Sequence, residues 1–457
     1  MLSLKKREQS PLTVERRTTS LMSKKKLIVI SHDAMVGEDL ETLQYLPTFR
    51  ELLNGAARVK AMRSVYPSLT YPVHASLSTG CRVGKHGILN NEIECLGAGP
   101  FTVPWHWFAD DIQVPTVFQQ AKKAGLTTAS VFWPVTGNDP GIDYLVAEYW
   151  TQGPDDNLYD AFRRAGSSDE MFEKVLNKRI PEMEGHEKTF PWCEDFICNC
   201  ACDIIREFQP DILYVHFGMI DGLRHLYGLF SRTLTAMLPE TDKYTGKIMD
   251  ACKQAGVFDD TNFVILSDHG HLNINRVLNF NALLKDAGFI RTDENDDIVD
   301  WDAIMHSCGL SGQIYVKDPS DEVLLKKVYD HLCFLRDEGI YGISRVFTAE
   351  EIKDLEGLYG NFSFMVESDG YTTFGKSDWH RPLVRPLSGD DWRTGQSTHG
   401  HYPDKGPQPT VIAKGPDFQP GAWIPSASVI DIAPTVGKLF GFEMPDAEGR
   451  ALEELLK

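Results

Sequence analysis

The sequence has no excess of positive charge and no long apolar run. Its 46 Lys and Arg residues are outnumbered by 65 Asp and Glu residues, so the formal net charge is −19 at pH 7. Such an acidic chain lacks the electrostatic footprint of a protein that binds nucleic acid or an anionic membrane, and no apolar stretch is long enough to span a bilayer. We predict neither nucleic acid nor membrane as a partner. A small anionic substrate would then need a local positive centre, and bound metal is one candidate.

The sequence also lacks the cysteine patterns of a disulfide framework or of a thiolate metal site. Its nine cysteines are scattered and include no Cys-x-x-Cys pair. The tightest group, Cys198, Cys200 and Cys202, lies in an expected helix in which Cys200 faces away from the other two, so packing explains it better than metal binding. This usage suits a reducing compartment.

Residues 1–22 lack the apolar core of a secretion signal. They carry five Lys or Arg residues against two acidic residues and show little apolar periodicity. We therefore expect a mobile tail there and a cytoplasmic protein.

A chain of 457 residues can bury a large core and is long enough for two or three domain-sized units. Through about residue 270, short apolar runs alternate with stretches of helical periodicity, which predicts a doubly wound α/β sheet with mostly parallel strands. Between about 276 and 394 the sequence is more charged and has one clear strand, Gly312–Val316. We predict a tail over 1–22, a catalytic core over 23–275 and 395–457, and an inserted cap or α+β subdomain over 276–394.

Three expected core strands are each followed by an aspartate. The runs Lys26–Ile30, Asp211–Phe217 and Phe263–Leu266 have the apolar character of strands buried on both faces. In an open α/β sheet, functional groups gather beyond the carboxyl ends of the strands. We expect three carboxylates to lie together there: Asp33, Asp221 and Asp268.

Histidines accompany these aspartates. His225 lies four residues after Asp221, on the same face of a helical turn. His269 follows Asp268 directly, and His399 lies in a loop flanked by glycine. Carboxylate and imidazole ligands together suit zinc, whereas oxygen ligands alone suit magnesium or calcium. Each histidine taken singly fits a structural hydrogen bond equally well. Five other histidines flank these motifs and are left out of the ligand set: His32, His74, His86, His271 and His401.

Thr70 lies where an anion would be stabilised. The loop Tyr66–Pro72 precedes an expected helix over Val73–Thr79, which Gly80 ends. Thr70 is therefore at or just before a helix N-terminus, where backbone N–H groups and the helix dipole favour negative charge.

The order of these motifs resembles the nucleotide pyrophosphatase/phosphodiesterase family of the alkaline phosphatase superfamily. The similarity runs from about Lys25 to the end of the chain and is weakest over 276–394. It implies an alkaline phosphatase-like fold, a three-layer α/β/α sandwich with a mostly parallel central sheet and an inserted cap. The residues that carry it are Asp33, Thr70, Asp221-x-x-x-His225, Ser267-Asp268-His269-Gly270, Thr398-His399-Gly400, the segment Tyr66–Asn91 and Asp431–Thr435.

The resemblance also implies roles for single residues. Two divalent metal ions would be bound, with zinc the expected ion and manganese the alternative. Thr70 would be the nucleophile, and Asn91 would hold a phosphoryl oxygen, with the neighbouring Asn90 as the alternative. One ion would be held by Asp221, His225 and His399, and the other by Asp33, Asp268, His269 and the Thr70 oxygen.

The implied chemistry is hydrolysis of a phosphodiester or pyrophosphate bond through a phospho-threonine intermediate. Metal coordination lowers the pKa of bound water from about 15.7 to roughly 7, and the same polarisation would favour a threonine alkoxide. In-line attack would form phospho-Thr70, which water would hydrolyse. Two divalent ions against three aspartates leave a charge of +1, or zero once Thr70 ionises, which suits a diester monoanion better than a monoester dianion.

Other functions stay open at this point. A phosphomonoesterase, a phosphonate hydrolase or a phosphosugar mutase of the same superfamily would use the same ligands, and a catalytically silent phosphate- or nucleotide-binding protein would keep them as well. A sulfatase is set aside because Cys81–Lys85 lacks the Pro and Arg of the Cys/Ser-x-Pro-x-Arg motif. The oligomeric state is not predicted. Two roles are open for one aromatic group, stacking on the leaving group or packing under the insert. Its members are Trp105, Trp107 and Phe108.

Overall fold

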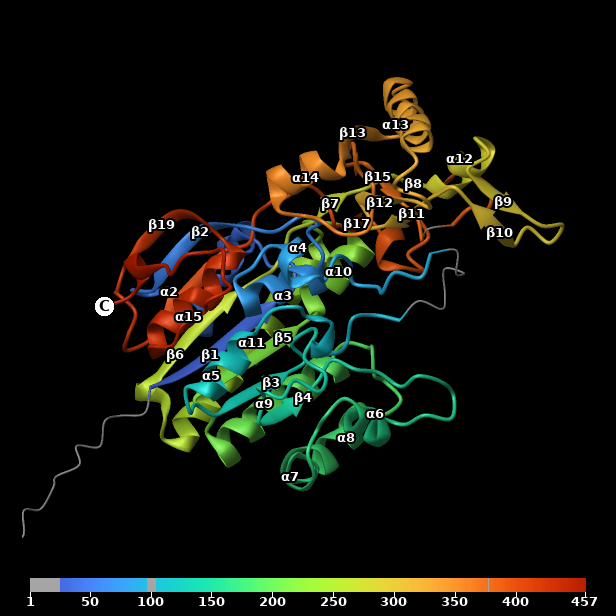
Figure 1. Ribbon diagram of the computed structural model, residues 1–457. Helices are drawn as coiled ribbons and strands as arrows, with labels where there is room; N and C mark the ends of the chain where they lie inside the picture. Colours follow the sequence, from blue (N-terminus) through green and yellow to red (C-terminus); the bar gives the residue numbers. More distant parts are fainter. Residues whose placement is uncertain (1–24, 97–103, 377) are drawn as a thin grey trace, which may run out of the picture.

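The computed structural model describes residues 25–96, 104–376 and 378–457. The tail predicted over 1–22 lies outside the described residues. A sheet of eight strands crosses the molecule in the order β19-β2-β18-β6-β1-β5-β3-β4 (Figure 1). Every neighbouring pair is parallel except the two pairs made by β18. The strands are β1 (Lys26–His32), β2 (Ala57–Arg63), β3 (Thr128–Val131), β4 (Tyr144–Val146), β5 (Ile212–Phe217), β6 (Thr261–Leu266), β18 (Val411–Lys414) and β19 (Trp423–Ser428).

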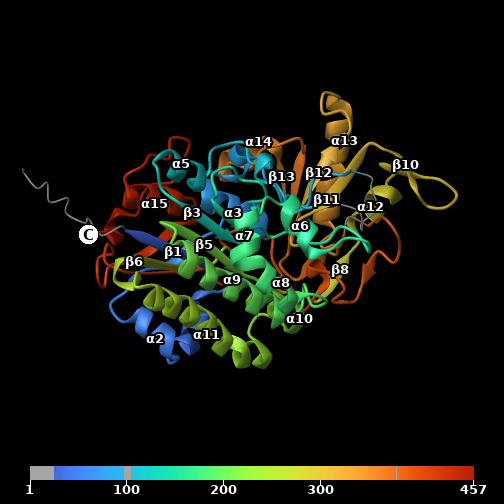
Figure 2. The ribbon, with the colours of Figure 1, turned by 90° about the horizontal axis from the view of Figure 1, so that it is seen from below.

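Helices cover both faces of this sheet (Figure 2). Successive residues of a strand point to opposite faces, so Leu27 and Val29 of β1 pack in one core while Ile28 and Ile30 pack in the other. The predicted three-layer α/β/α sandwich is confirmed. The first core lies under α3 (Thr70–Thr79), α5 (Val117–Lys123) and α15 (Ile432–Phe440), and the second under α2 (Pro47–Leu53), α9 (Trp192–Phe208) and α11 (Arg232–Ala255).

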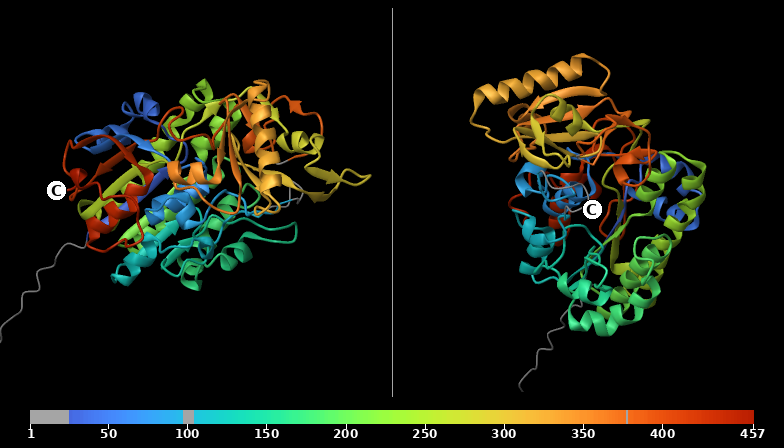
Figure 3. Two further views of the ribbon diagram at one scale, coloured as in Figure 1. Left: turned by 45° about the horizontal axis from the view of Figure 1, so that its top comes forward. Right: turned by 90° about the vertical axis from the view of Figure 1, so that its right-hand side faces the viewer.

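A smaller antiparallel sheet lies within residues 303–368, inside the range where an inserted subdomain is predicted. Its order is β11-β12-β14-β13, and α13 (Glu322–Asp337) and α14 (Ala349–Glu356) pack against it. Figure 3 shows this unit at one end of the central sheet. Its strands are β11 (Ala303–Ser307), β12 (Ser311–Val316), β13 (Ile343–Thr348) and β14 (Phe364–Ser368).

The other elements are short helices and strands around these two sheets, and their strands form one three-stranded and two two-stranded sheets. Among the described residues, no helix combines the length and apolar character that crossing a membrane requires. The elements are α1 (Leu40–Leu43), α4 (Val83–His86), α6 (Leu158–Arg164), α7 (Asp169–Met171), α8 (Asn177–Met183), α10 (Met219–Tyr227), α12 (Phe280–Asp286), β7 (Leu272–Asn273), β8 (Arg276–Leu278), β9 (Ile290–Thr292), β10 (Ile298–Trp301), β15 (Thr372–Phe374), β16 (Val384–Arg385) and β17 (Ser397–Thr398).

The carboxyl ends of three central strands meet at one edge. β6, β1 and β5 are adjacent and parallel, so the residues that follow them emerge side by side. β1 leads to Asp33, β6 leads to Asp268, and β5 leads into α10 through Gly218. β17 pairs with β7, just beyond β6, and so carries His399 to the same edge. Segments far apart in the chain thus form one site.

Candidate metal centre

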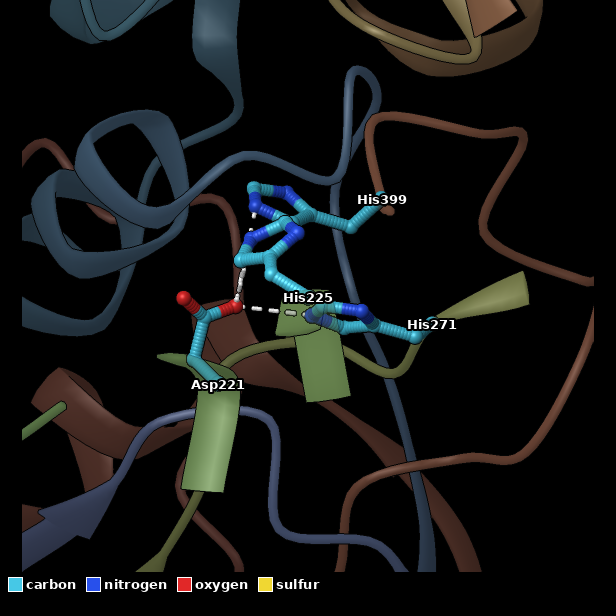
Figure 4. A group of neighbouring side chains, drawn as sticks. All are labelled: Asp221, His225, His271 and His399. Atoms are coloured by element: carbon cyan, nitrogen blue, oxygen red, sulfur yellow. Dashed lines mark hydrogen bonds and ion pairs between the residues drawn. The ribbon is translucent and has the colours of Figure 1, made fainter. Parts of the chain in front are cut away.

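Four side chains converge on one point at this edge: Asp221, His225, His271 and His399 (Figure 4). Their potential ligand atoms all lie within 4.8 Å of one another. Oδ1 of Asp221 is 3.2 Å from Nε2 of His225, 2.7 Å from Nε2 of His271 and 3.8 Å from Nε2 of His399. Three imidazoles therefore turn the same ring nitrogen toward one carboxylate oxygen.

The opposite ring nitrogens show which tautomer two of these histidines adopt. Nδ1 of His225 is 2.9 Å from the Ser397 carbonyl oxygen, and Nδ1 of His399 is 3.0 Å from the Ser68 carbonyl oxygen. A carbonyl only accepts, so each Nδ1 carries the hydrogen and each neutral ring presents a lone pair at Nε2. A lone pair that faces a carboxylate oxygen is repelled unless a proton or a metal cation lies between them, and although burial lowers the pKa of His225, Asp221 raises it. A metal ion at this point would take the place of that proton. The donor set therefore fits a divalent metal ion of the zinc type.

A second group contains Asp33, Asp268 and His269, whose potential ligand atoms also lie within 4.8 Å of one another. Nε2 of His269 is 3.5 Å from Oδ1 of Asp33, 3.2 Å from Oδ2 of Asp268 and 3.3 Å from the Thr70 hydroxyl. Oδ1 of Asp268 accepts a hydrogen bond from the Ala34 N–H at 3.1 Å. Among the described residues, Oδ1 of Asp33 and Oδ2 of Asp268 are buried without a hydrogen-bond partner. These oxygens fit a second divalent ion.

The electrostatics of the site favour a bound cation. Burial, followed by the charges of Asp268 and Asp221, raises the pKa of Asp33 well above its usual range. Burial also opposes ionisation of Asp221, but His225 and His271 hold the pKa of that carboxyl well below its usual range. Burial lowers the pKa of His399 well below 6.5, so this imidazole is neutral, the form that binds metal. Divalent ions would neutralise the carboxylates while leaving the imidazoles uncharged.

Two glycines let the ligand loops approach neighbouring backbone. A Cβ on Gly400, whose φ is +87°, would overlap the carbonyl oxygen of Cys308. A Cβ on Gly270 would overlap the carbonyl oxygen of Pro407. Both glycines belong to the motifs of the sequence, and these close contacts are the steric reason for glycine at each position. Each glycine follows a histidine of the site and allows its loop to pack closely.

Thr70 is the first residue of α3, which confirms its predicted place at a helix N-terminus. Next in the chain, the Tyr71 N–H donates to Oδ1 of Asn91 at 3.0 Å. Asn91 lines the same cavity as Thr70. The side chain of Asn90 is instead used inside the fold, because it donates to the Ser307 carbonyl and accepts from the Asn91 N–H. The geometry therefore favours Asn91 over Asn90 as a substrate contact.

The cavity beside the ligands has a volume of about 360 Å³, and several aromatic side chains line it. Trp105 lines it, whereas Trp107 and Phe108 pack against Tyr149. Only Trp105 of the predicted aromatic group therefore borders the site. Lys188 is the only Lys or Arg among the described residues that line the cavity. The other large aromatic residues that line it are Tyr71, Phe132, Trp150, Phe190 and Trp392.

The structure brings all the predicted site residues to one edge of the sheet and adds a histidine that the sequence analysis leaves out. His271 belongs to the group around Asp221. Its sequence signal is the spacing His269-Gly270-His271, because alternate residues of an extended segment share a side. His401 points elsewhere, with Nε2 on the Lys405 carbonyl at 3.1 Å. The residues brought together are Asp33, Thr70, Asn91, Asp221, His225, Asp268, His269 and His399.

Comparisons with known proteins agree with this geometry. Residues 27–352 match the family model described as type I phosphodiesterase / nucleotide pyrophosphatase. The chain is 26% identical over 253 residues to the venom phosphodiesterase of Macrovipera lebetinus, and 24% identical over 253 residues to ectonucleotide pyrophosphatase/phosphodiesterase family member 3 of Bos taurus. Each match covers 53% of this chain, and 25% and 24% of the relative, respectively. The chain thus spans about a quarter of the length of these curated relatives.

Solved structures show the same fold. The murine ectonucleotide pyrophosphatase/phosphodiesterase 5 superposes with a TM-score of 0.64 at 18% identity, and the match covers 95% of this chain and all of that one. The human counterpart superposes with a TM-score of 0.65 at 17% identity, and the match again covers 95% of this chain and all of that one. The alkaline phosphatase-like fold is therefore confirmed. Because the family model matches well over half of its residues, the chain belongs to the type I phosphodiesterase / nucleotide pyrophosphatase family.

Proposed function

We propose that this protein is a metal-dependent hydrolase of phosphodiester or pyrophosphate bonds that acts through a phospho-threonine intermediate on Thr70. One observation carries the proposal. The Thr70 hydroxyl lies at the start of a helix, 3.3 Å from His269 within a group of metal-binding type, and shares a cavity with the second such group. A hydroxyl placed there would attack a phosphorus atom in the cavity.

Each of the two side-chain groups, around Asp221 and around Asp33, would hold one metal ion. Asp221, His225 and His399 would hold one ion, and Asp33, Asp268, His269 and the Thr70 oxygen would hold the other. Zinc suits this mixture of carboxylate and imidazole, and manganese is the alternative. When bound, the ions supply Lewis-acid polarisation of the attacking and leaving oxygens.

The chain's own residues account for the other parts of the reaction. Thr70 Oγ1 forms a bond to phosphorus as the bond to the leaving oxygen breaks, and the hydroxyl proton is released to solvent. The backbone N–H groups at the start of α3 favour the negative charge of the phosphoryl group. The amide of Asn91 donates to a phosphoryl oxygen. Water then attacks phosphorus, the Thr70–phosphorus bond breaks, and Thr70 regains its proton.

The charge of the cavity supports a diester or pyrophosphate substrate over a phosphomonoester. Three aspartates balance most of the charge of two divalent ions, and only Lys188 adds a cation among the described lining residues. Burial raises the pKa of Glu148 and of Glu194, which also line the cavity, to about 7. Any fraction of these groups that ionises disfavours a dianion further.

The printed names of the relatives support the same substrate class. The curated relatives are named phosphodiesterases and nucleotide pyrophosphatases. An inactive threonine-to-alanine variant of the murine structural neighbour is described in complex with AMP. We propose a small phosphorylated molecule as the substrate. Cytoplasmic location stays a prediction.

Paired kinetics on zinc-loaded protein test the proposal. We expect kcat/KM for bis-p-nitrophenyl phosphate and for the nitrophenyl ester of thymidine 5′-phosphate to exceed that for p-nitrophenyl phosphate. A preference for the monoester would contradict the charge argument and indicate a phosphomonoesterase. No turnover of either ester with two ions bound would favour a phosphonate hydrolase or a silent binding protein.

Variants of Thr70 test the intermediate. Thr70→Ala should abolish turnover, whereas Thr70→Ser should retain measurable activity because it keeps the hydroxyl. Rapid acid quenching of wild-type protein with a ³²P-labelled diester should trap label on the protein, and Thr70→Ala should trap none. Equal turnover in wild type and Thr70→Ala would refute the nucleophile assignment.

A further inference from the structure

His271 occupies a place among the ligands that neither the family resemblance nor the predicted ligand set assigns. Its side chain is fully buried, and its Nε2 is 2.7 Å from Oδ1 of Asp221. Its ring centre lies 4.5 Å from that of His225 and 5.1 Å from that of His399 (Figure 4). His271 is thus as close to the centre of the group as the two histidines proposed as ligands.

The other ring nitrogen of His271 indicates which tautomer it adopts. Nδ1 lies 3.0 Å from the Ser397 hydroxyl oxygen. That hydroxyl donates its single hydrogen to the Arg224 carbonyl at 2.7 Å, so it accepts from His271. Nδ1 therefore carries the hydrogen of the neutral ring, and Nε2 presents a lone pair toward Asp221.

His225 and His399 have the same arrangement, with Nδ1 on a backbone carbonyl and Nε2 turned inward. Ser397 holds two of the three rings, since its carbonyl accepts from His225 and its hydroxyl accepts from His271. Outer partners of this kind fix the tautomer and orientation of metal-binding histidines. One residue thus orients two inward-facing imidazoles.

We propose that His271 is a ligand of the ion held by Asp221, His225 and His399, so that the protein supplies one carboxylate and three imidazoles. This inference rests on the proposed two-metal function. Four protein ligands are typical of closed zinc sites, whereas catalytic zinc sites keep a position open. The protein would then supply four ligand atoms to each of the two ions, and loss of the His271 imidazole should weaken binding of the ion at Asp221.

The competing role for His271 is that of a positioning residue. In that role Nε2 would carry a hydrogen and donate it to Asp221, and the ring would not touch the ion. The two roles differ in the location of one hydrogen and in the effect of replacing the ring by an amide. His271→Gln keeps a donor for Asp221 but loses the imidazole.

Metal binding by His271→Gln tests the proposal, with His401→Gln as the matched control. His401 is also buried and near the site, but its Nε2 lies on the Lys405 carbonyl. Zinc affinity would be measured by competition with a chromophoric chelator, and stoichiometry by elemental analysis. We expect wild type and His401→Gln to bind two ions. We expect His271→Gln to weaken one site by more than about 100-fold, beyond the 10–100-fold loss typical of removing an outer partner.

Two spectroscopic measurements separate the roles without depending on activity. Cobalt-substituted His271→Gln should show altered visible absorption, because the ligand set of one ion changes. In zinc-loaded wild type labelled with ¹⁵N at histidine, His271 should show a hydrogen on Nδ1 and none on Nε2. The second measurement uses unaltered protein, so it holds even where the variant fails to fold.

Two results would overturn the proposal. One is an Nε2–H signal for His271 in the zinc-loaded protein, and the other is wild-type zinc affinity and cobalt absorption in His271→Gln. Failure of wild-type protein to bind two ions would instead contradict the proposed function itself. The two failures are therefore distinguishable.

Discussion

Oδ1 of Asp33, Oδ2 of Asp268 and Nε2 of His225 are buried and, among the described residues, lack a hydrogen-bond partner. A buried polar atom left in this way costs about 1–3 kcal/mol, and more when it is charged. Three such atoms at one edge of a sheet indicate that a ligand completes their bonding. Because two of them are carboxylate oxygens, a cation would satisfy them.

Asn90 and Asn91 are adjacent and buried, but substitution of Asn91 should mainly lower activity, whereas substitution of Asn90 should mainly lower stability. Asn91→Ala removes the proposed donor to a phosphoryl oxygen, and loss of one such donor typically lowers kcat by about 10²–10³-fold. Asn90→Ala removes bonds to the Ser307 carbonyl and the Asn91 N–H, so it should lower the free energy of unfolding by about 1–3 kcal/mol. Kinetics and denaturant unfolding of both variants provide the test. A larger kcat loss in Asn90→Ala would reverse the assignment.

At the scale of helices and strands, the elements that carry the site could be predicted from the sequence. The apolar runs that became β1, β5 and β6 are long enough to show burial on both faces, and Gly80 marks the end of α3 with φ +72°. The small sheet was harder to predict. β13 is interrupted by Arg345, β14 by Glu367, and β11 ends in His306 and Ser307, so only β12 was predicted.

Side-chain geometry within the loops could not be predicted. Whether His271 faces the site depends on the path of the chain after β6, which is set by contact of Gly270 with Pro407. That contact joins residues more than a hundred positions apart and leaves no local pattern. The assignment of Asn91 over Asn90 likewise depends on bonds to Tyr71 and Ser307.

Gly400→Ala should destabilise the protein much more than Gly256→Ala. Both glycines have a left-handed φ, at +87° and +71°, so alanine costs about 1–2 kcal/mol of backbone strain at either place. A Cβ on Gly256 meets open space, whereas one on Gly400 overlaps the Cys308 carbonyl. We expect a loss of at least about 3 kcal/mol for Gly400→Ala, measured by urea unfolding of the metal-free proteins. Equal losses would show that the clash is relieved by movement of the loop.

The contact between α3 and α4 should make stability depend on pH. Burial lowers the pKa of His86 to about 3, and its Nε2 lies 2.9 Å from the Ser76 hydroxyl while Nδ1 accepts from the Ile88 N–H. In the unfolded chain His86 binds a proton as the pH falls through about 6.5, whereas in the folded chain it stays neutral until the pH reaches about 3. Stability from this residue is therefore complete above pH 6.5 and is lost as the pH falls toward 3.

His86→Asn should remove that part of the pH dependence. One proton corresponds to a slope of about 1.4 kcal/mol per pH unit, so the wild-type slope between pH 6 and pH 4 should exceed that of the variant by up to this amount. Urea unfolding at several pH values measures both slopes. Identical slopes would mean that His86 stays neutral in the unfolded chain as well or is charged in the folded one.

At the scale of the whole molecule, negative charge at the site adds to a net charge of −19. Asp33, Asp221 and Asp268 lie together at one sheet edge, and Lys188 is the only Lys or Arg among the described residues that line the adjoining cavity. The folded protein without metal therefore carries a concentrated repulsion that divalent ions would remove. Metal should act as a stabiliser of the fold as well as a participant in the reaction.

Metal removal should lower the melting temperature of wild type. Asp33→Asn should raise the melting temperature of the metal-free protein. Zinc at 100 times its Kd would raise the free energy of unfolding by about 2.7 kcal/mol for each site that it fills. In metal-free protein, Asp33 is raised in pKa by burial and by Asp268, so the folded state holds a proton that the unfolded state releases. Stability of that form should consequently fall as the pH rises above about 4.

Asp33→Asn removes the charge but keeps the shape, so at pH 8 the metal-free variant should melt above metal-free wild type. With zinc present the order should invert, because the amide is a poorer ligand than the carboxylate. Calorimetry of both proteins with zinc and with chelator gives the four melting temperatures. If the variant melts lower under both conditions, Asp33 stabilises the fold through its own contacts. Repulsion among the three aspartates would then not be what lowers the stability of the metal-free protein.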